Sequence, residues 1–144
     1  MFKRVLLAYD GSESGQQALL NCREIAAWSH SELFLVAIMP SPINLSVDGV
    51  YDGVADLEAD RRRYEEILAE GVKQLSEDER AVTGEVLVGD SVEQISKFAK
   101  QIEADLIVVG HRHLDSWAQR WWRGSSTRSL IEFAPCSVLV VITH

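Results

Sequence analysis

The stretch Arg4–Asp10, RVLLAYD, is a short apolar run that ends in an acidic residue. Apolar residues on both sides of the chain are typical of a strand in a parallel sheet, because helices cover both faces of such a sheet. Gly11 and Ser12 follow the run, and a segment with helical spacing begins directly after them. We therefore predict that Arg4–Asp10 is the first strand of a sheet whose strands are connected by helices.

The rest of the chain repeats this alternation. Four further apolar runs predict strands over Glu32–Met39, Val82–Asp90, Asp105–Gly110 and Ser137–Ile142. Segments with apolar residues three and four apart predict helices, and they cover about Glu13–Trp28, Val54–Leu75, Ser91–Ile102 and Ser126–Phe133. Ser91 and Gln94 also fit a capping box at the start of the third helix. The pattern predicts one doubly wound α/β domain over residues 1–144, with a parallel sheet and helices on both faces.

Two polar turns follow apolar strands at positions where such folds bind ligands. In a doubly wound sheet, ligands bind beyond the carboxyl ends of the strands, near the point where the strand order reverses. Asp10-Gly11-Ser12 closes the first strand, and Gly110–Ser126, GHRHLDSWAQRWWRGSS, follows the fourth. We therefore expect the functional residues at these two places.

Composition excludes several classes of protein. The net charge of −8 disfavours binding to nucleic acid or to an anionic membrane. No segment approaches the roughly 18 consecutive apolar residues of a membrane span, and the N-terminal apolar run is interrupted by Asp10 and lacks a leader cleavage site. Cys22 and Cys136 lie in apolar surroundings without a CxxC motif, which favours buried, reduced thiols. These features predict a cytoplasmic protein.

Three separated motifs together resemble the universal stress protein family. They are VLLAYDGSESGQQAL near the start, VLVGDSVEQI before the third helix, and DLIVVGHR…GSS…APCSVLVV at the end. The resemblance spans nearly the whole chain and keeps the order of the family's elements. It implies a five-stranded parallel sheet of order 3-2-1-4-5 and a homodimer formed through the last strand, Ser137–Ile142. It also implies one of two branches, of which one binds ATP and the other does not.

The motif of the ATP-binding branch is present in altered form. The family pattern is Gly, two residues, Gly, nine residues, and then Gly followed by Ser or Thr. This chain supplies Gly110 and the pair Gly124-Ser125, but His113 stands at the second glycine, and the ten residues Leu114–Arg123 replace nine. A glycine-rich loop lets backbone N–H groups approach phosphate without an intervening Cβ, and a histidine adopts positive φ only at a steric cost. We therefore expect a degraded or remodelled phosphate loop.

The resemblance implies ATP or a related adenine nucleotide, accompanied by Mg²⁺, in the crevice beyond the first and fourth strands. Asp10 and the backbone near Ile38 are expected to hold the adenosine, and Gly89 to let the sugar approach. Gly110 and the Gly124-Ser125 pair are expected to hold the phosphates. By their charge, Arg112 or Arg123 is expected to offset the lost glycine through charge-assisted contacts. The full set of expected site residues is Ala8, Tyr9, Asp10, Ile38, Gly89, Gly110, Arg112, His113, Gly124, Ser125 and Ser126.

Each of these features also has a simpler interpretation. Asp10 suits a turn or a helix cap, and Gly124–Thr127 suits an ordinary helix N-terminus. His111 and His113 lack the three or four ligands of a metal site, so no metal site is expected. A protein that binds no nucleotide and docks a partner through its altered loop is the alternative function.

An enzyme is a further hypothesis. The chain has no GxSxG motif and no histidine placed as a base for Ser125 or Ser126, so no catalytic residue is expected. A slow ATPase would require nucleotide binding together with an activated water, for which the sequence identifies no base.

Overall fold

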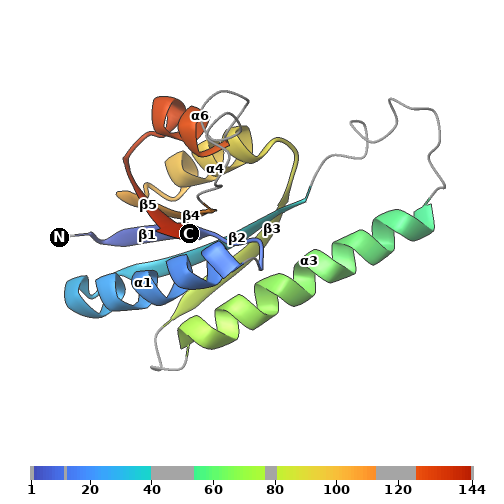
Figure 1. The fold of residues 1–144 in the computed structure, drawn as a ribbon, viewed down its shortest axis with the longest axis horizontal. Coiled ribbons are helices and arrows are strands. Elements are labelled where there is room, and N and C mark those ends of the chain that lie inside the picture. Colours follow the sequence, from blue (N-terminus) through green and yellow to red (C-terminus); the bar gives the residue numbers. More distant parts are fainter. Residues whose placement is uncertain (1, 12, 40–53, 77–80, 113–125, 144) are drawn as a thin grey trace.

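The computed structural model describes residues 2–11, 13–39, 54–76, 81–112 and 126–143, and Figure 1 shows their arrangement. The elements in chain order are β1 (Arg4–Ala8), α1 (Glu13–Ser29), β2 (Glu32–Met39), α3 (Val54–Leu75), β3 (Val82–Val88), α4 (Ser91–Gln101), β4 (Leu106–Arg112), α6 (Ser126–Phe133) and β5 (Ser137–Thr143). All strand pairs are parallel, and the strand order is β3-β2-β1-β4-β5. The predicted fold class and strand order are therefore confirmed.

Helices cover both faces of the sheet, which explains why the strands are apolar throughout. Figure 1 shows α1 and α3 on one face and α4 and α6 on the other. Alternate residues of β1 serve the two faces, because Val5 and Leu7 belong to the core under α1 and α3, whereas Leu6 belongs to the core under α4 and α6. All three are fully buried. Burying each such side chain contributes about 1.5–3 kcal/mol.

Gly71 allows α3 to lie close to the sheet. A Cβ atom at this position would come within 2.6 Å of Leu35 Cδ2 and 3.0 Å of the Tyr9 ring. The missing side chain therefore brings α3 against β2 and against the end of β1. Ile67, one helical turn earlier in α3, packs against Gly11 in the loop after β1. Its Cγ2 atom lies 3.4 Å from the position that a Cβ atom on Gly11 would occupy.

The start of α4 differs from the sequence-based prediction. The N-cap residue is Asp90, whose carboxylate accepts a hydrogen bond from the Glu93 N–H at 3.0 Å. The predicted cap at Ser91 is wrong by one residue. The reason is that β3 ends at Val88 and Gly89 turns the chain at φ +137°, so the helix begins at Ser91 itself.

The amino edge of the sheet fixes the start of β1. The Asp105 carboxylate accepts hydrogen bonds from the N–H groups of Lys3 and Arg4, at 2.7 and 3.0 Å. The Arg4 guanidinium donates to the Ile102 carbonyl at 3.2 Å. These bonds join β1 to the turn before β4. They set the register that also determines where β1 ends relative to β4.

Both cysteines are free thiols, and their environments differ. Cys22 is buried under the sheet, as expected, whereas Cys136 is only half-buried. Burial, followed by the negative charge of Asp105, raises the pKa of the Cys136 thiol above its usual value. In the part of the chain that the structure describes, none of the helices has both the length and the apolar character to cross a bilayer.

Candidate functional site

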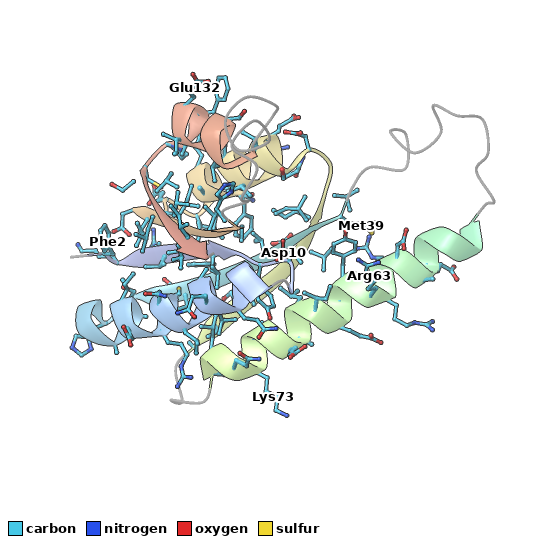
Figure 2. All side chains as sticks on the ribbon, viewed as in Figure 1. Phe2, Asp10, Met39, Arg63, Lys73 and Glu132 are labelled. Carbon is cyan, nitrogen blue, oxygen red and sulfur yellow. The ribbon has the colours of Figure 1, made fainter. Side chains whose placement is uncertain are left out.

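A notch in the carboxyl edge of the sheet creates the candidate site. The last residue of β1, Ala8, pairs with Val36 of β2 and Val109 of β4. Beyond these partners, β2 continues to Met39 beside β3, and β4 continues to Arg112 beside β5. The central strand therefore stops short of both neighbours. Figure 2 places Asp10 and Met39 on this side of the sheet, away from Phe2 at the opposite edge.

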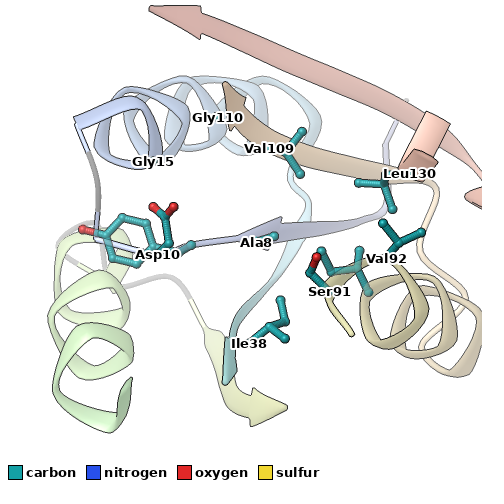
Figure 3. A pocket seen from close by; sticks show the side chains of 11 residues that line it. Ala8, Asp10, Gly15, Ile38, Ser91, Val92, Val109, Gly110 and Leu130 are labelled. Carbon is teal, nitrogen blue, oxygen red and sulfur yellow. The ribbon is translucent and has the colours of Figure 1, made fainter. Parts of the chain in front are cut away.

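A cavity of about 220 Å³ lies at this notch (Figure 3). Its walls come from the ends of β1, β2 and β4 and from the first turns of α1 and α4, with one residue from α6. The lining residues are Ala8, Tyr9, Asp10, Gly15, Ile38, Ser91, Val92, Ile95, Val109, Gly110 and Leu130. Asp10 lies at one end of the cavity, and Val92 and Leu130 lie at the other. The site therefore has a polar end and an apolar end.

The cavity brings together five of the residues predicted from the sequence, which are Ala8, Tyr9, Asp10, Ile38 and Gly110. Gly89 lies in the turn between β3 and α4, and it is not among the lining residues. Arg112 is the last residue of β4, and Ser126 is the first residue of α6. His113, Gly124 and Ser125 lie outside the described residues.

Six lining residues were not predicted from the sequence, namely Gly15, Ser91, Val92, Ile95, Val109 and Leu130. Val92 and Ile95 lie on the apolar face of α4, and the same spacing also fits a helix that simply covers a sheet. The sequence places both residues near the carboxyl edge of the sheet, where ligands bind in such folds. This position indicates a cavity only when it is known that β1 ends before β2 and β4.

Asp10 provides the polar end of the cavity, whereas the ring of Tyr9, another lining residue, packs beside Gly71 of α3. Tyr9 is 3% exposed, and its N–H donates to the Val36 carbonyl at 2.9 Å. Burial raises the pKa of the Tyr9 hydroxyl, and the negative charges of Glu70 and Asp10 raise this pKa further. A tyrosine hydroxyl is protonated at neutral pH, and the raised pKa keeps it so. The Asp10 side chain is exposed, so a ligand in the cavity can reach it.

The backbone of Ile38 also faces the notch. The Val36 carbonyl accepts from Tyr9 on the β1 side, whereas the Met39 carbonyl accepts from the Gly89 N–H, at 2.9 Å, on the β3 side. Successive residues of a parallel strand turn their N–H and C=O groups to alternate sides. The N–H and C=O of Ile38 therefore point toward β1, at a level where β1 has already ended. A donor and an acceptor lie side by side there.

Three helices begin at the same edge of the sheet. α1 follows β1, α4 follows β3, and α6 begins at Ser126 after β4. The N-terminus of a helix carries roughly half a positive charge and favours anions. Gly15 and Ser91, in the first turns of α1 and α4, line the cavity. The site therefore combines an apolar pocket with a positive electrostatic contribution from the backbone.

The described residues show no metal centre. Within them, no group of three or more His, Cys, Asp or Glu side chains is arranged to hold a metal ion. His111 is the next-to-last residue of β4. His113, the other histidine of this segment, lies outside the described residues. The described site offers apolar side chains at one end and the exposed Asp10 carboxylate at the other.

Comparison with known proteins identifies related chains. The model of the universal stress protein family matches residues 1–141. A protein of Staphylococcus aureus (strain USA300), provisionally named a universal stress protein, is 30% identical over 146 residues, which is 99% of this chain and 86% of that protein.

Solved structures share the fold. A member of the universal stress protein family from Burkholderia pseudomallei is 24% identical and has a TM-score of 0.75, with 96% of this chain and 95% of that chain covered. A universal stress protein from Archaeoglobus fulgidus, solved with dAMP, is 20% identical (TM-score 0.71, 96% and 97% covered). One from Arabidopsis thaliana, solved with AMP, is 18% identical (TM-score 0.73, 99% and 92% covered).

Proposed function

The chain belongs to the universal stress protein family, and from that premise we propose that it binds an adenine nucleotide at the carboxyl-edge cavity. Two relatives of the same fold were solved with AMP or dAMP. The cavity is lined by apolar side chains at one end and by Asp10 at the other. An apolar pocket with few polar groups is the usual form of a small-molecule site.

The observation that carries the proposal is the orientation of the Ile38 backbone. Adenine presents a donor, its amino group, beside an acceptor, its N1 atom. The C=O and N–H of Ile38 form the complementary pair at the notch. Guanine presents an acceptor beside a donor on the same edge, so it would leave both backbone groups unpaired. Because unpaired buried polar groups cost about 1–3 kcal/mol each, the backbone selects adenine over guanine.

The remaining parts of the nucleotide follow from this placement. Asp10 lies at the opposite end of the cavity from Val92 and Leu130 and can accept hydrogen bonds from the ribose hydroxyls. The phosphates are proposed to point toward Gly110 and the start of α6, where the helix N-terminus favours negative charge. ATP with Mg²⁺ is the fullest form of the ligand in this proposal, and turnover of the nucleotide is not part of it.

Two further proposals concern assembly and location. We propose that two copies pair through β5, which lies at an edge of the sheet and exposes Leu139 and Ile142. An apolar edge strand is a template for pairing with another chain. We also propose a cytoplasmic location, because free cysteine thiols are maintained in reducing compartments.

Calorimetry tests the nucleotide proposal. The unmodified protein should release or absorb heat with AMP, ADP and ATP but not with GMP. Asp10→Ala should weaken AMP binding by about 10- to 150-fold, the usual effect of losing hydrogen bonds to a charged group. Asp60→Ala, which removes an acid from α3 outside the cavity lining, is the matched control and should bind normally.

The result that would contradict the proposal is no heat with any adenine nucleotide. In that case, the interaction protein without a nucleotide would be the better hypothesis. Mass spectrometry of the denatured, purified protein provides an independent check, since a bound adenine nucleotide that copurifies with the chain would be detected by its mass.

A further inference from the structure

Ser91 contributes a polar side chain away from the Asp10 end of the cavity. Among the described lining residues, polar side chains come only from Tyr9, Asp10 and Ser91. Figure 3 shows Ser91 across the cavity from Asp10, beside Val92 and near Ile38. The other lining side chains from α4 and α6 are apolar, and they belong to Val92, Ile95 and Leu130. A ring buried at this end therefore meets one hydroxyl in an otherwise apolar wall.

The position of Ser91 is fixed relative to Ile38. The Gly89 N–H donates to the Met39 carbonyl at 2.9 Å, which ties the turn before α4 to the end of β2. Asp90 caps the helix by accepting a hydrogen bond from the Glu93 N–H. As the first residue of α4, Ser91 is held on a regular element and not on a mobile loop.

We propose that the Ser91 hydroxyl hydrogen-bonds a ring nitrogen of the bound base and is a specificity-determining residue of the site. This inference rests on the proposed function. Purine rings carry several nitrogen acceptors, whereas the wall around Ser91 offers them hydrocarbon. A buried acceptor without a partner is costly, and a serine hydroxyl can rotate to donate to it while accepting a bond from elsewhere. The Ile38 backbone then pairs with the amino group and N1 of the base, and the Ser91 hydroxyl donates to a ring nitrogen elsewhere on it.

Binding measurements with altered bases test this role. The ligands are AMP and its 1-deaza, 3-deaza and 7-deaza analogues, each of which replaces one ring nitrogen by carbon. Ser91→Ala should weaken AMP binding by about three- to tenfold, the effect of one uncharged hydrogen bond. The unmodified protein should bind one of the three analogues more weakly than AMP, by the same three- to tenfold factor. Ser91→Ala should bind that analogue and AMP with equal affinity, because the hydrogen bond is already absent.

Two variants separate this role from a structural one. Ser91→Thr keeps the hydroxyl and should retain AMP affinity. Unlike Ser91→Ala, it should again bind AMP more tightly than the sensitive analogue. Ser96→Ala makes the same change on the same helix away from the cavity lining and should leave AMP binding unchanged. All variants should unfold near the temperature of the unmodified protein, because Asp90 remains as the cap.

The outcomes distinguish the inference from the function on which it rests. If the unmodified protein binds AMP and Ser91→Ala binds it equally well, the role of Ser91 is wrong and the proposed function stands. The role of Ser91 is also wrong if the loss of affinity from AMP to each analogue is the same in Ser91→Ala as in the unmodified protein. If the unmodified protein binds no adenine nucleotide, the proposed function fails and the inference fails with it.

Discussion

Gly89 holds a backbone conformation that a side chain would strain. Its φ of +137° is rarely adopted by L-residues, and a Cβ there would lie 3.0 Å from Gln94 Nε2. Its N–H bond to Met39 fixes the turn that carries Asp90 and Ser91. Gly89 thus positions the α4 wall of the site, although it is not among the residues that line the cavity.

Gly89→Ala should therefore lower the free energy of unfolding by about 1–3 kcal/mol, the usual cost of such a strained residue. Urea denaturation measures this change. Lys97→Ala, an exposed change on α4, is the control and should stay within about 0.5 kcal/mol of the unmodified protein. Equal stability of Gly89→Ala and the control would show that the turn tolerates a side chain.

His113 carries the main departure from the family's phosphate motif, and it lies outside the described residues. We expect a remodelled loop that still allows adenine nucleotides to bind, because Asp10 lines the cavity and α6 begins at Ser126. His113→Gly should then change ATP affinity by less than about threefold, which is less than 1 kcal/mol. Calorimetry in parallel with the unmodified protein gives the answer. A large rise in affinity would show instead that the imidazole fills the phosphate site.

The helices show how far sequence patterns determine an element. The spacing of apolar residues predicted α3, and α6 was also predicted with the bounds that the structure has. The start of α4 was predicted from Ser91 and Gln94, but the structural cap is Asp90. Ser and Asp are both good N-caps, so adjacent candidates cannot be ranked from residue type. The turn at Gly89 decides between them.

Asp90→Ala tests the revised cap. It should lower the free energy of unfolding by about 0.5–2 kcal/mol, the usual cost of removing an N-cap. Ser91→Ala should change stability by less than about 0.5 kcal/mol, since the N-cap of α4 is Asp90. Thermal or urea unfolding of both variants measures the difference. The opposite order of effects would restore the original prediction of a cap at Ser91.

The strands show which part of the site could not be predicted from the sequence. The apolar run Arg4–Asp10 predicted a strand, yet pairing of β1 ends at Ala8. Hydrophobicity does not reveal where one strand stops relative to its neighbours. The notch, the exposed backbone of Ile38 and the inclusion of Ser91 all depend on that difference. Asp10 and Gly110 could be predicted because each is the last residue of a recognisable apolar run.

Across the whole molecule, the alternation of strands and helices predicted the fold class, whereas the strand order came from the family resemblance. The order β3-β2-β1-β4-β5 leaves β5 at an edge. On this strand, Val138 and Val140 pack against the core under α4 and α6, while Ile142 is 51% exposed. Ile142, near the end of β5, is therefore more accessible to a second copy than Val140.

Ile142→Lys should convert the proposed dimer to a monomer, because a charge would be buried between two edge strands. Light scattering coupled to size-exclusion chromatography measures the mass. Glu132→Lys, an exposed change on α6, is the control and should remain dimeric. A variant Ile142→Lys that keeps the mass of a dimer would place the interface elsewhere, and a monomeric unmodified protein would exclude the dimer.

The position of a bound nucleotide is the decisive test of the proposed site. A crystal structure of the protein with AMP should show the purine in the notch beyond Ala8, with its amino group and N1 at the Ile38 backbone. The ribose should lie beside Asp10 and the phosphate toward Gly110 and the start of α6. AMP bound at another surface, or an empty cavity in crystals grown at saturating AMP, would show that the proposed site is wrong.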